Sequence, residues 1–394
     1  MKKYISIMII CGLLLSFMAA PGCNIEFGDW SQVKYERTVQ KQTPLASGST
    51  LNVQTSSGHI TIEGADVNEC SVAAEITGRA STDLEAQELA EQTQIELRLD
   101  GDMLTIKADK PRTGRNQSIS VSFDIVVPRE INIRCESSYG EIKLTNIKGR
   151  INGRTSSGAV RAENIEGTTQ LETSYGSVTV GDITGEKINI KTSSGAVTAE
   201  NIKGSTQLDT SYGSVTCEKF SGDDIRLRTS SGRVRLSDAN FKTCDVSTSY
   251  GSVETNELEG QSIILHSGSG GIDVTDTSVD TADISTSYGH VKCRQITVNE
   301  LKAKSGSGAI DIACSKATPA ELIAYVDTSY GSIDFTPPPG FAGQVELVTS
   351  YGSINTEMPI TVIGQVSKKN IKGSVGDGNG KLYLKTGSGS IHIK

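Results

Sequence analysis

The sequence predicts an all-β chain folded as a parallel β-helix (β-solenoid) of 18–19-residue coils, with a small N-terminal β-rich region that contains one helix. A glycine-centred signature recurs every 18 or 19 residues and alternates between T-S-Y-G-S-V and T-S-S-G-x-V. A fixed short period indicates one structural unit stacked on copies of itself. Aromatic residues make up only 5 % of the chain and glycines number 41, which suits stacked strands with tight corners.

Each signature glycine marks a corner between two short strands. Valine or isoleucine stands two residues after each glycine, as at Val178 and Val215, and apolar residues alternate on both sides of the corner. Such alternation predicts strands that each bury one face. A 37-residue coil of four strands is the alternative, because tyrosine and serine alternate with that longer period; the inward positions repeat every 18 or 19 residues and favour about 13 short coils. The signature glycines are Gly140, Gly158, Gly176, Gly195, Gly213, Gly232, Gly251, Gly270, Gly289, Gly308, Gly331, Gly352 and Gly389.

We divide the chain into four parts: a signal peptide at residues 1–22, a polar tether at 23–45, a capping region at 46–135 and the solenoid at 136–394. Within the capping region, Leu84, Leu89 and Ile95 predict a helix over residues 81–97. Strands are expected at 103–107 and 118–127. The last residues, 390–394, carry no evident cap, so we expect an open edge there and self-association through it.

The N-terminus has the features of an export signal. Lys2 and Lys3 precede an apolar run, and small residues then lead into Gly22 and Cys23. This ending resembles the lipobox of bacterial lipoproteins, with Ala20 where leucine is usual. The resemblance implies a lipid anchor on Cys23 and an extracytoplasmic location, at the outer membrane or cell surface. Simple secretion is the main alternative. A retained transmembrane helix is a further alternative, which is disfavoured because the apolar run is too short to span a bilayer.

The order of motifs resembles a known family. A run S-S-G-H-I-T-I-E-G at residues 56–64, a helix, I-V-V-P at 125–128 and serial S-Y-G-x-I and S-S-G-x-V strands follow one another. This pattern is similar to the bacterial putative-adhesin domain of unknown function (toastrack type) and to related autotransporter adhesin-head repeats, over about residues 45–394. The resemblance implies an exported or membrane-linked protein without assigned catalytic residues, and some relatives are associated with envelope stress signalling.

The signature tyrosines are the candidate ligand-binding residues. If all of them lie at one corner of the solenoid, they form a column of rings that suits sugar faces or protein partners. The alternative is that each ring packs across the smaller serine or glycine side chains of neighbouring coils. The threonines three residues before the glycines share the inward face, so we expect their hydroxyls to satisfy backbone groups at the corner. The seven tyrosines are Tyr139, Tyr175, Tyr212, Tyr250, Tyr288, Tyr330 and Tyr351.

Two functions agree with this pattern: adhesion or ligand binding to a surface glycan, and a structural or stress-signalling role through an envelope protein partner. A polysaccharide-acting β-helix enzyme is a further alternative, but the coils are nearly uniform and show no nucleophile elbow, phosphate loop or paired carboxylates. The formal net charge of −8 disfavours nucleic acid as a partner.

We expect no cofactor and no metal site, because no Cys/His cluster has metal-ligand spacing. A single G-S-G-G-I-D run from Gly268 matches calcium-binding repeats only weakly, since no tandem copy follows it. Six cysteines follow Cys23, and four of them stand at or near inward positions of the repeat. We expect buried, unbonded thiols that act as small apolar residues.

Overall fold

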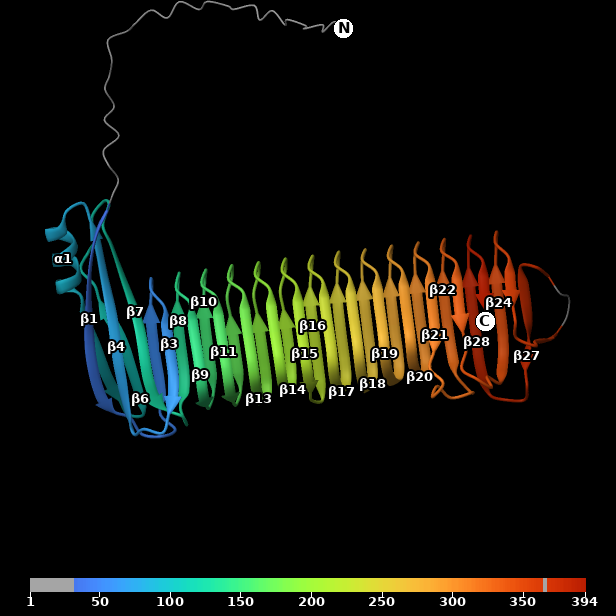
Figure 1. Cartoon of the computed structure of the whole chain (residues 1–394), viewed down its shortest axis with the longest axis horizontal. Helices are drawn as coiled ribbons and strands as arrows, with labels where there is room; N and C mark the ends of the chain where they lie inside the picture. Colours follow the sequence, from blue (N-terminus) through green and yellow to red (C-terminus); the bar gives the residue numbers. More distant parts are fainter. Residues whose placement is uncertain (1–31, 364–366) are drawn as a thin grey trace, which may run out of the picture.

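The chain forms an elongated parallel β-solenoid with a β-rich, helix-bearing region at its N-terminal end (Figure 1). The computed structural model describes residues 32–363 and 367–394. Strands account for 65 % of the structure, and the solenoid has about 11 turns of ~19 residues. The predicted fold class is confirmed. The signal peptide and Cys23 lie outside the described residues.

Each coil adds one strand to each of two parallel sheets. We call the sheet before the signature glycines the first sheet and the one after them the second sheet. Val160 pairs with Ile142 on one side and with Val178 on the other, so the coil is 18 residues here and the 37-residue alternative is excluded. The strands of this regular part are β8 (Asn132–Ser137), β9 (Ile142–Lys148), β10 (Ile151–Thr155), β11 (Val160–Glu166), β12 (Thr169–Glu172), β13 (Val178–Lys191), β14 (Val197–Asp209), β15 (Val215–Ser221), β16 (Asp224–Thr229), β17 (Val234–Thr248), β18 (Val253–Ser267), β19 (Ile272–Thr286), β20 (Val291–Ser305), β21 (Ile310–Cys314), β22 (Ile323–Thr328) and β23 (Ile333–Thr336).

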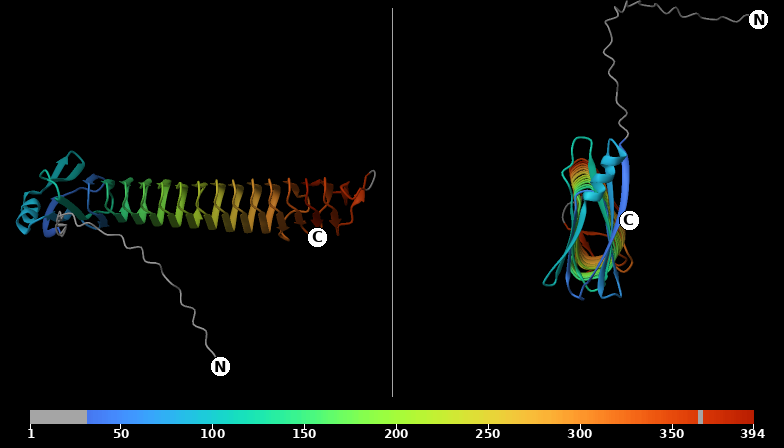
Figure 2. Two further views of the ribbon diagram at one scale, coloured as in Figure 1. Left: turned by 90° about the horizontal axis from the view of Figure 1, so that it is seen from above. Right: turned by 90° about the vertical axis from the view of Figure 1, so that its left-hand side faces the viewer.

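The two sheets face each other along the solenoid (Figure 2). The core between them is a column of aliphatic side chains. Buried and exposed residues alternate along the strands, as the period of two predicts. Val178, Val197 and Val215 lie directly above one another in register and are fully buried. Stacking therefore buries the apolar face that no single coil could bury alone.

Backbone contact between coils explains the signature glycine. A Cβ atom added at Gly213 would lie 1.9 Å from the carbonyl oxygen of Gly195, a distance that side chains do not adopt. Thr210 completes the corner: its hydroxyl donates to the Gly195 carbonyl at 2.9 Å and accepts from the Gly213 amide at 3.3 Å. The same pair of bonds recurs along the solenoid, so the predicted role of the threonines is confirmed.

Each coil has a second corner, where the chain turns from the second sheet back to the first sheet. In nine successive coils this corner contains a residue in the left-handed conformation. The φ angles of these residues lie between 45° and 59°, a region that favours glycine, asparagine and aspartate. Asparagine and aspartate fill six of the nine positions, whereas Lys219, Glu257 and Gln295 carry longer side chains there. The nine residues are Asn146, Asn164, Asp182, Asn201, Lys219, Asp238, Glu257, Asp276 and Gln295.

The N-terminal end stacks out of chain order. The coil of β2 (Thr50–Thr55) and β3 (Ile60–Ala65) pairs with β8 and β9 on its inner side. On its outer side it pairs with β6 (Met103–Asp109) and β7 (Ser118–Pro128), which come later in the sequence. Both coils belong to the solenoid stack, which therefore begins before the predicted boundary at residue 136.

Antiparallel strands and a helix cover this outermost coil. β4 (Glu69–Ala80) pairs with β7, β1 (Val33–Pro44) pairs with β4, and β5 (Gln94–Asp100) pairs with β6. The predicted tether is therefore wrong for β1, which lies in the sheet along its whole length.

The helix is shorter than predicted. α1 (Asp83–Gln92) begins after the N-cap Thr82, whose side chain accepts a bond from the Glu85 amide. The predicted helix extended to residue 97, but alternating Ile95, Leu97 and Leu99 pair as a strand with β6. None of the helices in the described part of the chain is long and apolar enough to cross a bilayer.

The C-terminal end also stacks out of chain order. The last strands, β28 (Gly380–Thr386) and β29 (Ile391–Ile393), pair with β22 and β23 on one side. On the other side they pair with β24 (Gly343–Thr349) and β25 (Ile354–Thr356), which precede them in the sequence. The expectation of an open edge at residues 390–394 is wrong, because β29 has a strand on each side.

The outermost C-terminal coil is thus β24 and β25. β27 (Asn370–Val375) covers β24 in antiparallel orientation, and β26 (Thr361–Val362) pairs with β27. Eleven of the 13 predicted coils stack in chain order, and the coils of Gly352 and Gly389 complete the count in reversed order.

Candidate functional site: the tyrosine ridge

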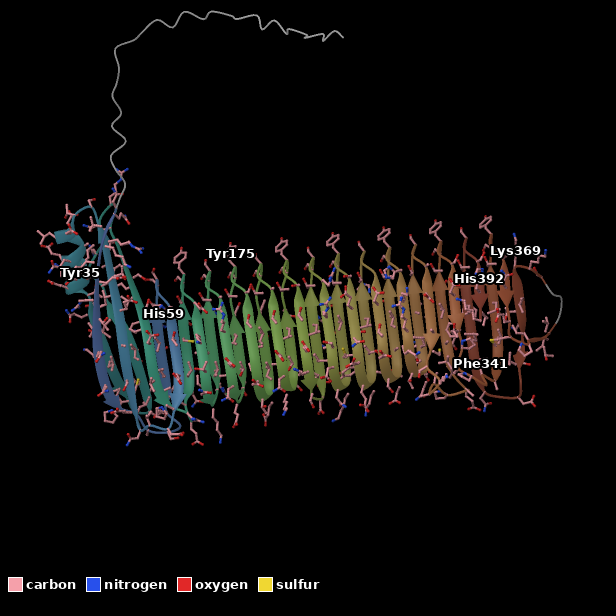
Figure 3. The ribbon with its side chains drawn as sticks, in the orientation of Figure 1. Tyr35, His59, Tyr175, Phe341, Lys369 and His392 are labelled. Carbon is pink, nitrogen blue, oxygen red and sulfur yellow. The ribbon has the colours of Figure 1, made fainter. Side chains whose placement is uncertain are left out.

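The seven signature tyrosines are the most exposed large hydrophobic side chains of the described part of the solenoid. Their exposed fractions lie between 69 % and 82 %. Tyr175, labelled in Figure 3, projects from the edge of the solenoid where the chain turns from the first sheet into the second. The alternative in which the rings pack across neighbouring coils is therefore wrong. We call this row of seven rings the tyrosine ridge.

The backbone beneath the exposed rings is held by hydrogen bonds between coils. The amides of Tyr175, Tyr212 and Tyr250 donate to serine carbonyls of the preceding coil at 2.9–3.0 Å. The glycine that follows each tyrosine packs directly on the glycine below. The ridge therefore presents exposed aromatic rings from a corner with a hydrogen-bonded backbone.

Tyrosine and serine alternate along the stack at this corner. Serine fills the position in every coil between two tyrosine coils, and adjacent strands lie about 4.8 Å apart. Successive rings are therefore spaced by about 9.6 Å, which is twice the strand spacing. The six serines are Ser157, Ser194, Ser231, Ser269, Ser307 and Ser388, and Ser57 fills the same position in the coil before that of Tyr139.

The reversed order of the C-terminal coils maintains this alternation. Along the sequence, Tyr330 is followed by Tyr351 and only then by Ser388. In space, the Ser388 amide donates to the Ser329 carbonyl, and the Tyr351 amide donates to Gly387 of the Ser388 coil. Ser388 thus lies between Tyr330 and Tyr351, and the two-coil spacing extends to the end of the stack.

Charged side chains on the outer face of the first sheet follow the same two-coil period. Four residues before the glycine, several tyrosine coils carry an acid and the serine coils beside them carry a base, as in the 2.8 Å ion pair of Arg154 with Glu172. Opposite charges on adjacent coils stabilise the native register. The acids are Glu136, Glu172, Asp209 and Asp327, and the bases facing them are Arg154, Lys191, Arg228, Lys304 and Lys385.

The cysteines are core residues, as predicted. Cys70, Cys135, Cys217, Cys244 and Cys293 are buried, Cys314 is half-buried, and all six are unbonded. Burial raises the pKa of the Cys135 thiol to about 12, and that of Cys217 likewise. These thiols stay protonated near neutral pH and are poor nucleophiles. Among the described residues, no three His, Cys, Asp or Glu side chains gather as a metal site would require.

The geometry can thus support repeated surface contact, and the sequence identified all seven aromatic residues of the ridge.

Comparison with protein families gives a match over the C-terminal part of the chain: residues 216–394 match the Toastrack DUF4097 family model. This part of the chain is similar to that family, and the match covers less than half of the chain. The resemblance to the toastrack-type family is confirmed there. The matched residues carry Tyr250, Tyr288, Tyr330 and Tyr351 and the reversed coils.

Several crystal structures are similar to the chain at low identity. A putative cell adhesion protein from Clostridium sporogenes is 10 % identical, over 91 % of this chain and 99 % of that one, with a TM-score of 0.15. A putative adhesin from Bacteroides fragilis is 13 % identical over 91 % and 97 %, with a TM-score of 0.18. A putative lipid binding protein from Parabacteroides distasonis is 12 % identical over 91 % and 96 %, with a TM-score of 0.22. At these scores the likeness carries no argument. No curated protein matches the sequence significantly.

Proposed function

We propose that this protein is a non-catalytic, adhesin-like β-solenoid of the cell envelope that binds a surface glycan through the tyrosine ridge. The observation that carries the proposal is the regular spacing of seven exposed rings along the whole stack. Folding does not require these rings, because serine fills the same corner in the intervening coils.

Physical chemistry supports a contact role for the ridge. A tyrosine ring presents a flat apolar face and a hydroxyl, and it is ordered at low entropic cost. The ring spacing of about 9.6 Å is close to the length of a disaccharide in an extended β-linked glycan, so successive disaccharides can meet successive rings. Weak individual contacts on a rigid scaffold add up to avidity.

The location is part of the proposal. The lipobox-like run ending at Cys23 supports export and a lipid anchor at the outer membrane or cell surface. The full-length protein should incorporate a fatty-acid label in its bacterial host, and Cys23→Ser should abolish the label. Label retained in the Cys23→Ser variant would rule out this anchor.

A glycan array tests the ridge directly. Residues 24–394 are compared with variants in which one, three or all seven ridge tyrosines become serine, the residue that the intervening coils carry. We expect the binding to fall progressively with each added substitution while the melting temperature stays nearly constant.

Tyr325 and Tyr383 provide the matched control. Their ring centroids lie 6.3 Å apart on the outer face of the first sheet, away from the ridge. The double variant Tyr325→Ser, Tyr383→Ser should bind glycans like the parent. Glycan binding that survives loss of all seven ridge tyrosines would refute the proposal, as would capture of one envelope protein without glycan binding.

A further inference from the structure

A second surface with different chemistry lies on the outer face of the first sheet, near its N-terminal end. A groove of about 660 Å³ crosses β8, β10, β12 and the end of β13. It lies where the chain enters the first sheet in each of these coils, whereas the tyrosine ridge follows the end of the first-sheet strand. The two surfaces are thus separated by the length of a strand.

An in-register row of polar side chains forms part of the groove lining. Asn152 pairs in register with Arg134 on one side and with Gln170 on the other, and Gln170 pairs with Asn189. Within residues 32–363 and 367–394, the side-chain amides of Asn152, Gln170 and Asn189 make no hydrogen bond. Each amide offers two donors and one acceptor oxygen to a ligand.

The groove is positively charged although the protein is acidic overall. Arg134, Arg150 and Lys187 line it, and no acidic side chain does. None of these three cations forms an ion pair with another described residue. In contrast, Arg154 in the neighbouring column is paired with Glu172 at 2.8 Å.

The next groove along the same sheet shows that this charge is local. It shares Lys187 but is also lined by Glu186, Asp224 and Asp245. There Arg226 is paired with Asp245 at 3.2 Å. Of these two grooves, the first is therefore lined by cations alone, whereas the second is lined by cations and acids together.

We propose that this groove binds an extended acidic oligosaccharide, with Arg134, Arg150 and Lys187 on its carboxylate or sulfate groups and the amide row on its hydroxyls. Arginine holds a carboxylate or sulfate with two parallel N–H donors, which suits the acidic sugar. Amides that both donate and accept suit sugar hydroxyls. The groove lining contains no aromatic side chain on which a nucleobase could stack, which favours a sugar acid over a nucleic acid.

Binding to oligogalacturonate tests the proposal, with its methyl ester as the neutral form of the same chain. Calorimetry with residues 24–394 should show binding to the acid and none to the ester. The double variant Arg134→Gln, Lys187→Gln should weaken binding about tenfold or more, because charged hydrogen bonds are lost. Asn152→Ala with Gln170→Ala should weaken it by a smaller factor. Chondroitin sulfate in parallel distinguishes sulfate from carboxylate as the recognised group.

Arg154→Gln with Lys191→Gln is the matched control, since it removes the same charge from the same sheet outside the groove. It should leave the affinity for oligogalacturonate unchanged. Equal binding of the methyl ester, or equal weakening by the control, would overturn the proposal. So would binding of a single-stranded DNA oligomer at equal strength, or no binding to either acidic glycan. The seven-serine ridge variant should retain this binding, so the two proposed sites can fail independently.

Discussion

The interior coils and the end coils of the solenoid both have to pair their backbone N–H and C=O groups, and they do so in different ways. An interior coil has a similar coil on each side, so the signature glycine and its threonine satisfy the backbone at every level. An end coil has an outer edge, which would pair with another chain if left exposed. At both ends a pair of coils stacks in reversed order, and antiparallel strands cover the outermost one. Repetition thus builds the body, and reversed order with antiparallel strands closes its ends.

The two covers differ in thickness. At the N-terminal end, α1, β1, β4 and β5 bury residues such as Ile76 and Leu89. At the C-terminal end, the short β26 and β27 leave Ile360 and Ile371 only partly buried. We therefore expect the C-terminal end to open first, since local stability follows buried apolar contact.

Removing residues 380–394 should produce the largest effect. It takes away the coil between β23 and β25 and leaves a gap of about 9.6 Å, two strand spacings, between the coils on either side. Hydrogen exchange should show lost protection from β22 onward, with unchanged protection in the interior coils, because repeat stacks couple only nearest neighbours. His392→Ser, an outward change in β29, serves as the control. Retained protection of β24 in the truncated chain would contradict the stacking order.

Glycine-to-alanine changes compare the interior with the end directly. A Cβ atom would lie 1.9 Å from a carbonyl oxygen at Gly213 and 2.0 Å at Gly352. Gly213→Ala should lower the free energy of unfolding by about 4 kcal/mol or more, because two packed coils must separate. Gly352→Ala should only detach the outermost coil. Urea denaturation followed by circular dichroism measures both. Equal losses would show that the end is as cooperative as the interior.

Alkaline pH should weaken the interior through its thiols. Burial raises the pKa of Cys135 and of Cys217 to about 12, whereas an unfolded thiol titrates near 8.5. Between about pH 9 and 12 the unfolded chain has lost protons that the folded chain retains, so stability falls as pH rises. Each thiol contributes up to about 1.4 kcal/mol per pH unit in that window. Urea denaturation at a series of pH values measures the slope.

Cys217→Ala should reduce this slope, although the variant is less stable at neutral pH because its core has a small cavity. The half-buried Cys314, nearer the C-terminal end, should react with iodoacetamide before the buried thiols do. An unchanged slope in the variant would show that the thiol already titrates in the folded chain.

The smallest expected effect is a gain in stability from a substitution at the second corner. Glu257 has a φ of 55°, a left-handed conformation that is energetically unfavourable for most non-glycine residues. Asparagine adopts this conformation at a lower energetic cost than glutamate does. Glu257→Asn should raise the free energy of unfolding by about 0.5 kcal/mol. Glu259→Asn, with the same charge change outside the left-handed position, should have no such effect. Equal gains in both variants would attribute the stabilisation to charge alone.

The repeat predicted the coil, its inward residues and the corner hydroxyls because each depends only on spacing within one unit. Stacking order was not predictable, since similar coils such as those of Gly352 and Gly389 fit the same neighbours equally well. The helix boundary was missed because Ile95 suits a helical and an alternating pattern alike. Exposure of the ridge rings was also undecided, since a corner tyrosine can fold over its neighbours or away from them. The residues of the amide row, Asn152, Gln170 and Asn189, stand at equivalent positions of the repeat, but the sequence did not predict the groove in which they lie.

The reversed C-terminal coils have a consequence for the order of events in biosynthesis. A stack in chain order could grow coil by coil as the chain emerges, but the coil of Tyr351 has no neighbour to rest on until residues 380–394 have arrived. Residues 380–394 therefore fill an interior position although they follow the outermost coil in the sequence. The C-terminal end of the stack can therefore close only after residues 380–394 have been synthesised, so folding of this end must follow translation of that segment.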